Sequence, residues 1–190
     1  MANALIDFLR LFRDVSEADA ELIRKATEER TYKEGDYLFR GDSICREMFF
    51  IVDGVLRIMV VNEEGNQVTH FFLKPNQFCT IINSFTNQVK AHESICAACN
   101  ADVLVLSKSR LDQLYQQLPY LKTLIDQITR QALVDKIALR NAYLGQDSTT
   151  RYKTFMARQP EIALRVSLSD VASYLGITPQ SLSRIRKKMH

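Results

Sequence analysis

The sequence predicts an α+β protein: an antiparallel β-barrel of the double-stranded, jelly-roll type, a long helix, and a small helical domain. Three observations predict it. Short apolar runs alternate with turn signals from Thr31 onward, a helical apolar repeat begins near Lys108, and two capped helices around Gly176 close the chain. The expected domains are the barrel with the segment before it at 1–108, the long helix with a hinge at 109–146, and the small helical domain at 147–190.

Two short helices are expected before the barrel. The first presents one apolar face, formed by Leu5, Ile6, Leu9 and Phe12. The second begins at Ser16, which forms a capping-box pattern with Asp19, and runs through Ile23.

The barrel is predicted from four apolar runs, each followed by a turn signal with Gly, Asn, Asp or Pro, and from two further expected strands. They lie at 37–39, 48–52, 55–61, 68–73, 91–98 and 103–106. Strands this short at this spacing are typical of an antiparallel sandwich or barrel.

A long helix follows, from about Tyr120 to Leu144. Apolar residues recur every three or four positions from Leu114 to Ala132, which is the spacing of a coiled-coil seam. Beyond Asp135 the helix is apolar nearly all round, so it needs cover on several sides. Either it packs only within its own chain, or a partner's helix covers one side. The second interpretation predicts a homodimer through Leu121, Ile125, Ile128, Ala132 and Leu139.

The C-terminal segment carries the strongest motif. Short helices are expected at 149–157 and 161–165, and a further helix capped by Ser167 with Asp170 ends at Gly176. Thr178 caps the next helix, and Pro179 suits its first position. Two helices joined by a short glycine-containing turn form a helix-turn-helix. The alternative is an ordinary helical hairpin with a solvated basic end.

The second helix of this motif supplies the candidate DNA contacts. Leu182, Ile185 and Met189 are expected on its buried face. Gln180 suits an adenine and Arg184 a guanine in the major groove. The residues expected to contact phosphates are Thr178, Ser181, Lys187 and Lys188.

The distribution of charge agrees with a nucleic-acid partner. The net charge is only +3. From Ser148 onward, however, eight bases and two acids give +6, so the first 147 residues carry −3. An acidic module followed by a basic one is typical of a nucleic-acid binder.

With these motifs the chain resembles the Crp/Fnr family of bacterial transcription regulators. The resemblance rests on Gly35, on the runs at 38–42, 50–57 and 64–65, on the long helix, and on 168–187, which is similar to the version common in Bacteroidetes. It implies a homodimer on a palindromic operator, with RNA polymerase as a further partner. It also places Pro179, Gln180 and Arg184 at base-contacting positions.

Two departures from the family pattern matter. Cyclic-nucleotide binders carry a Gly-Glu pair and an Arg-Ser pair, and here Thr80-Ile81 and Ala91-His92 stand in their place. Burying a cyclic phosphate without a cation is costly, so we expect no dependence on cyclic AMP and leave the effector unknown. The alternative is a sensor of cyclic nucleotides or other small molecules with an atypical pocket. The chain also stops after the second helix, so no wing contact is assumed.

Other chemistry has weaker support in the sequence. Cys96 and Cys99 would face opposite sides of a strand, and only His70, His92 and His190 could join a metal site. We find no catalytic motif, no signal peptide and no apolar run long enough for a membrane span. The expectation is a cytoplasmic protein that is not an enzyme and has no cofactor or metal.

Overall fold

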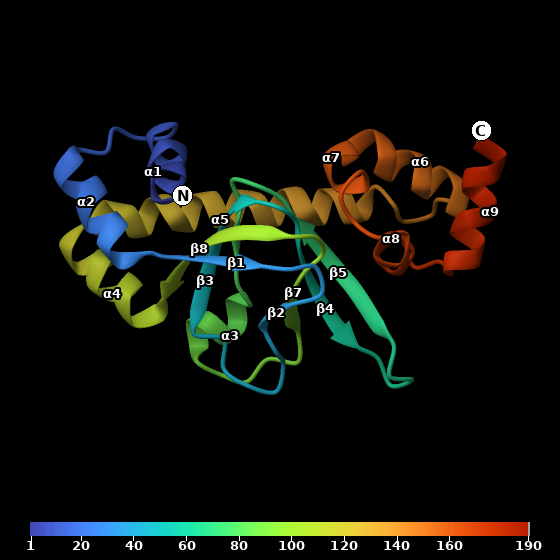
Figure 1. The fold of residues 1–190 in the computed structure, drawn as a ribbon, viewed down its shortest axis with the longest axis horizontal. Coiled ribbons are helices and arrows are strands. Elements are labelled where there is room, and N and C mark those ends of the chain that lie inside the picture. Colours follow the sequence, from blue (N-terminus) through green and yellow to red (C-terminus); the bar gives the residue numbers. More distant parts are fainter. Residues whose placement is uncertain (190) are drawn as a thin grey trace.

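The computed structural model describes residues 1–189 (Figure 1). His190, which was considered above as a metal ligand, lies outside the described residues. The helices are α1 (Ala2–Arg10), α2 (Glu17–Ala26), α3 (Ile82–Asn87), α4 (Lys108–Gln117), α5 (Pro119–Asn141), α6 (Ser148–Arg158), α7 (Pro160–Ala163), α8 (Leu168–Leu175) and α9 (Pro179–Met189). The strands are β1 (Glu28–Tyr32), β2 (Tyr37–Phe39), β3 (Glu47–Asp53), β4 (Leu56–Val61), β5 (Gln67–Leu73), β6 (Phe78–Cys79), β7 (Ser94–Ala97) and β8 (Ala101–Ser107).

The eight strands form two antiparallel four-stranded sheets, ordered β1-β8-β3-β6 and β2-β7-β4-β5. The expectation of a closed barrel is therefore wrong. The edge strands β2 and β6 are only three and two residues long, too short to continue the ladder from one sheet to the other. The antiparallel, mixed α and β character that the sequence predicts is confirmed.

Side chains alternate along β3 to build two cores. Phe49 and Ile51 point into the space between the two sheets, where they meet Leu56 and Ile95 of the other sheet. Phe50 points to the opposite face, where α1, α2, α4 and α5 cover the sheet. Both faces of β3 are thus buried, which explains why its sequence is an unbroken apolar run.

The helix α5 crosses nearly the whole length of the molecule (Figure 1). It carries α1, α2 and α4 at one end and α6 to α9 at the other, with the two sheets along its middle. Its first turns belong to the chain's own core, since Leu121 and Ile125 are buried. The sheets and the C-terminal helices are therefore held on one common element.

Three elements escaped the sequence prediction: most of β1, all of β6, and α3. The strand β1 reads Glu-Glu-Arg-Thr-Tyr and is half exposed, so it carries no apolar alternation. The helix α3 has no side-chain cap at its start and ends at Gln88 in the left-handed conformation. Tertiary pairing, rather than local pattern, forms these segments.

Candidate nucleic-acid interface and candidate effector cavity

The last two helices are joined by a tight turn that the sequence specifies. The Ser167 hydroxyl accepts a hydrogen bond from the Asp170 amide (3.1 Å), and Thr178 accepts one from the Ser181 amide (3.1 Å). Gly176 adopts the left-handed conformation (φ 66°) that ends α8. Both predicted caps and the predicted glycine turn are confirmed.

A small, fully buried contact fixes α9 against α8. Ala172 and Leu182 are completely inaccessible, and Ile185 is buried beside them. Met189, which was expected on the same buried face, is 44% exposed, so that expectation is wrong.

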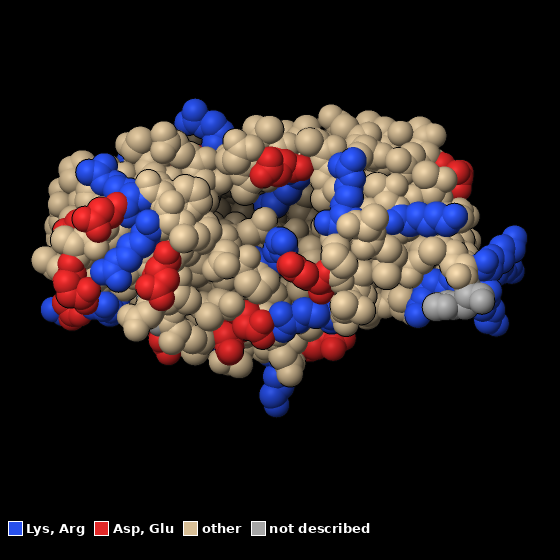
Figure 2. Space-filling view, turned by 90° about the horizontal axis from the view of Figure 1, so that it is seen from above, with Lys and Arg blue, Asp and Glu red and all other residues tan. Residues whose placement is uncertain are grey.

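The polar side of α9 is open to solvent. Its predicted DNA contacts are exposed except Ser181, which is half-buried: Thr178, Pro179, Gln180, Ser181, Arg184, Lys187 and Lys188. The salt bridges found among the described residues include none with Arg184, Lys187 or Lys188. Figure 2 shows Lys and Arg gathered at the end of the molecule that α9 forms. This arrangement leaves the bases available to an anionic partner.

The C-terminal helices are fastened to the sheet β2-β7-β4-β5. Arg57 of β4 forms a buried ion pair with Asp170 of α8. The Ser173 hydroxyl of α8 accepts from the Thr69 amide (2.9 Å) and donates to the Gln67 carbonyl (3.0 Å). These polar contacts surround an aromatic cluster of Phe72, Phe155, Tyr143 and Tyr174.

A second ion pair joins the C-terminal helices to the turn between β3 and β4. Arg165 donates two hydrogen bonds to the Asp53 carboxylate, each 2.8 Å long. The guanidinium holds the pKa of Asp53 below its usual range, mainly through these bonds. The orientation of α8 and α9 relative to the sheets is thus set by paired charges as well as by aromatic packing.

The residues predicted for dimerisation occupy different environments on α5. Leu121 and Ile125 are buried at 1% and 2% exposure inside the chain's own core. Ile128 packs partly on that core and Leu139 partly on the C-terminal cluster, while Ala132 lines a cavity. The apolar residues that α5 leaves exposed are Leu133, Val134 and Ile137. Sequence periodicity found the helix but did not distinguish its inner face from its outer one.

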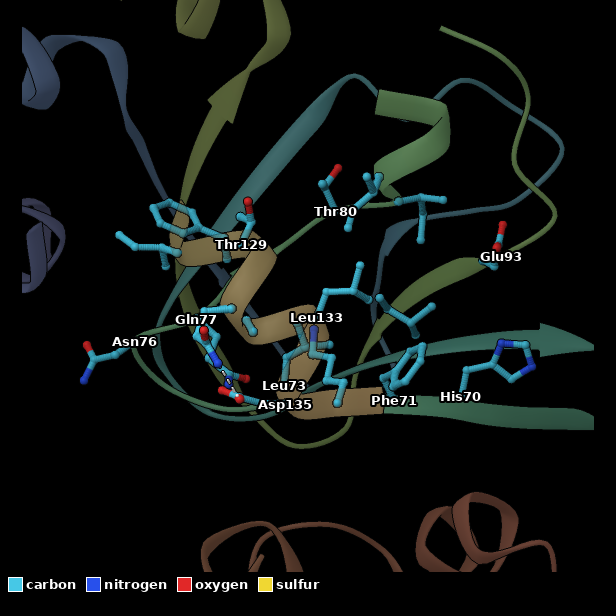
Figure 3. Close-up of a pocket in the computed structure, with 18 of the residues that line it drawn as sticks. His70, Phe71, Leu73, Asn76, Gln77, Thr80, Glu93, Thr129, Leu133 and Asp135 are labelled. Atoms are coloured by element: carbon cyan, nitrogen blue, oxygen red, sulfur yellow. Dashed lines mark hydrogen bonds between the residues drawn. The ribbon is translucent and has the colours of Figure 1, made fainter. Parts of the chain in front are cut away.

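A cavity of about 360 Å³ lies between α5 and the sheets. Its walls are mainly apolar and include Ile58, Phe71, Leu73, Ile81, Ile128 and Leu133. In Figure 3, Phe71 and Leu73 of β5 lie across from Leu133 of α5, while Glu93 and Asn76 lie at opposite edges. The volume and apolar lining are typical of a small-molecule site.

One cation lines this cavity and was missed by sequence reasoning. The Lys136 ammonium lies 5.7 Å from the centre of the Phe71 ring, and burial lowers the pKa of Lys136. Burial also lowers the pKa of His70 and raises that of the Cys79 thiol to about 12. A signal was available in the sequence, because Lys136 follows Ala132 and Thr129 by four and seven residues on one helix face.

The positions aligned with the family's nucleotide-binding pairs carry other chemistry. Thr80 donates to the Glu47 carbonyl (2.9 Å), and Ile81 is buried. Ala91 is buried in the inter-sheet core, whereas the His92 side chain is 93% exposed beside Asp42. Neither Ala91 nor His92 lines the cavity.

The cysteines form no cluster with other ligands. All four are free thiols, and Cys45, Cys79 and Cys96 are buried. Cys96 lies in β7, but Cys99 follows the strand rather than continuing it. Within residues 1–189, no group of three or more His, Cys, Asp or Glu side chains could hold a metal ion.

The comparisons agree with this geometry. Residues 29–118 match the family model of the cyclic nucleotide-binding domain. No curated protein matches the chain. One similar solved structure is CLP, a c-di-GMP responsive global regulator from Xanthomonas campestris, with 16% identity and a TM-score of 0.71 over 92% of this chain and 91% of that chain.

Two further solved structures are similar. FixK2 from Bradyrhizobium japonicum has 17% identity and a TM-score of 0.72 over 86% of this chain and 84% of its own. A protein from Eubacterium rectale described as a transcriptional regulator of the Crp/Fnr family has 17% identity and a TM-score of 0.68, over 96% of this chain and 87% of that chain. The chain has the Crp/Fnr-type fold.

In this Crp/Fnr-type fold, α5 and β5 each contact both the cavity and the C-terminal helices. A search of the described helices finds none that is both long and apolar enough to cross a membrane.

Proposed function

We propose that the protein is a sequence-specific DNA-binding transcription regulator of the Crp/Fnr type and is not an enzyme. The observation that carries the proposal is the exposed basic side of α9, whose opposite side is locked onto α8 by Leu182. In helix-turn-helix proteins the start of the second helix reads bases in the major groove. Residues 147–190 then form the DNA-binding domain.

In this proposal the chain acts as a homodimer. Residues 109–146 form the dimerisation helix and hinge, with the exposed Leu133, Val134 and Ile137 covered by the partner's α5. Two C-terminal domains related by a two-fold axis read half-sites about 34 Å apart, which favours a palindromic operator. RNA polymerase is a further partner, and the cytoplasm is where operator and polymerase occur together.

Residues 1–108 act as a sensor that does not depend on cyclic AMP. The observation in favour is that no arginine stands at Ala91, while His92 points outward next to Asp42. A cyclic phosphate placed there would have no buried cation to pair with. An effector bound under α5 would shift the dimer between arrangements with different spacing of α9.

The test is operator selection from random duplexes, followed by binding of variants to the selected site. We expect Arg184→Ala to lose about 1–3 kcal/mol and to relax specificity at one base pair. We expect Lys187→Ala to weaken all sequences alike and to reduce the salt slope by about one contact.

Lys153→Ala is the matched control, since Lys153 is an exposed base on α6 and is not among the predicted DNA-contacting residues of α9. A selected pool without any common motif would refute sequence-specific binding. Unchanged specificity in Arg184→Ala would remove that residue from base reading.

A further inference from the structure

The Lys136 side chain is an unusual feature of an otherwise apolar cavity. Within residues 1–189 its ammonium forms no hydrogen bond or ion pair. Its stem rises from α5 while its head lies 5.7 Å from the Phe71 ring of β5, so the charge spans the gap between helix and sheet. A partly buried cation without an anionic partner costs free energy that an anionic ligand would offset.

Neither of the two acidic side chains that line the cavity, Asp135 and Glu93, forms an ion pair with Lys136 within the described residues. Asp135 accepts a hydrogen bond from the Gln131 amide (2.8 Å). The charge of Glu93 acts on His70, at an edge of the cavity, and is not among the groups that act on Lys136. One positive charge therefore remains to be matched from outside the chain.

The remaining wall is mainly apolar by surface, although polar side chains such as Gln77, Thr80 and Thr129 also line the cavity. Ile58, Leu73, Ile81, Ile128 and Leu133 supply alkyl surface, and the volume is about 360 Å³. A ribose hydroxyl against such walls would lose its hydrogen bonds to water without replacement. A hydrocarbon chain or ring would instead gain by leaving water.

We propose that this cavity binds an apolar monocarboxylate, whose carboxylate pairs with Lys136 and whose hydrocarbon part lies between α5 and β5. Binding of the acid does not depend on the proposed function. Only the conclusion that such an acid is the regulator's effector rests on it. Lys136 also lines a neighbouring hollow formed with Leu139 and Pro160 at the start of α7. A ligand that engages Lys136 would thus act on the joint between the sensor and the C-terminal helices.

The test is titration calorimetry on the full chain without DNA, using decanoate as the probe. Decanol supplies the same hydrocarbon without the charge, and 3′,5′-cyclic AMP tests the nucleotide alternative. We expect decanoate to bind tighter than either. Lys136→Met should weaken decanoate at least tenfold and leave decanol unchanged, because it removes the charge and keeps the apolar stem.

Lys122→Met is the matched control, since Lys122 is exposed on the same helix and lies outside the cavity. It should bind decanoate as the unaltered chain does. Lys136→Arg should keep most of the affinity, and Lys136→Gln replaces Lys136→Met if the latter fails to fold.

Three results would overturn the proposal: tighter binding of cyclic AMP than of decanoate, equal decanoate affinity in the Lys136 variants, or no binding of decanoate. Because DNA is absent, none of these results depends on whether α9 reads an operator. Conversely, a failed operator selection would leave the calorimetric expectation unchanged.

Discussion

At the scale of single residues, two turn positions require glycine for different reasons. One has no room for a Cβ atom, and the other requires only a left-handed backbone conformation. Gly54, between β3 and β4, has φ 95°, and a Cβ there would lie 2.5 Å from the Asn100 carbonyl oxygen and 2.6 Å from the Ala101 Cα. Gly65, between β4 and β5, has φ 81°, and a Cβ there would meet nothing within 4 Å. Both need a left-handed backbone, but only Gly54 is also pressed against another segment of main chain.

We therefore expect Gly54→Ala to lower the free energy of unfolding by about 3–5 kcal/mol, the range of a severe backbone clash. Gly65→Ala should cost only about 1–2 kcal/mol, the penalty of the left-handed conformation alone. Urea unfolding of both variants measures the difference. Equal losses would mean that the 100–101 segment yields without cost.

The sequence predicts both glycines as turn residues, because each follows polar turn formers between apolar runs. It does not predict the contact with Asn100, since no local pattern connects the two positions. The same limit applies to Asp170. Its capping position was predicted and is confirmed through its amide, but its carboxylate pairs with Arg57, which lies 113 residues earlier.

At the scale of elements, that pair joins α8 to β4. The Arg57 and Asp170 side chains are only 11% and 15% exposed. Arg57 also donates to the Gln67 side chain (2.7 Å), while its Nε has no partner within the described residues. Losing the carboxylate would therefore leave a buried guanidinium without a counter-charge.

We expect Asp170→Asn to lower the free energy of unfolding by about 3–5 kcal/mol, because breaking one side of a buried pair is strongly destabilising. The double variant Arg57→Met with Asp170→Leu should recover most of that loss. Asp112→Asn is the control, since the Lys108–Asp112 pair is more exposed and should cost less than about 1 kcal/mol. Chemical denaturation of Arg57→Met, Asp170→Leu, the double variant and the unaltered chain completes a double-mutant cycle, with Asp170→Asn and Asp112→Asn measured beside it. Additive losses would contradict the coupling.

Periodicity identified α5 as a helix but could not assign its faces. Leu121 and Ile125 have the spacing of a coiled-coil seam, yet α1, α2, α4 and the sheet cover them in the same chain. An apolar stripe on a helix requires only that other apolar residues pack against it. Packing within the same chain therefore gives the same sequence pattern as packing against a partner's helix. The structure, but not the periodicity, shows that Val134 and Ile137 lie on the outer side of α5.

At the scale of the whole molecule, charge and apolar surface are separated along α5. Residues 1–147 carry a net charge of −3 and form the sheets and the helices at one end of α5, where Figure 2 shows Lys and Arg mixed with Asp and Glu. The basic C-terminal part lies at the other end (Figures 1 and 2). Between them, Leu133, Val134 and Ile137 are 39%, 53% and 50% exposed. A cluster of large apolar side chains left in water is typical of a protein–protein contact.

If a second copy covers this face, both basic ends lie on the same side of the dimer and can reach one duplex. We expect Ile137→Asp to convert the dimer to monomer in sedimentation velocity, because dimerisation would bury an unpaired carboxylate at the interface. Affinity for a palindromic operator should then fall at least tenfold, since the second half-site contact is no longer intramolecular.

Leu164→Asp is the control for Ile137→Asp, because Leu164 is 83% exposed and follows α7 rather than belonging to α5. It should leave both the sedimentation coefficient and operator binding unchanged. If the Ile137→Asp variant remains dimeric, the two copies must contact each other through another surface. Phe12, which follows α1, is then the next residue to substitute, because it is exposed and also lines the cavity under α5. If Phe12 contacts both the ligand and the partner subunit, ligand binding will change the geometry of the dimer. Sedimentation velocity with and without decanoate would measure this change in the sedimentation coefficient.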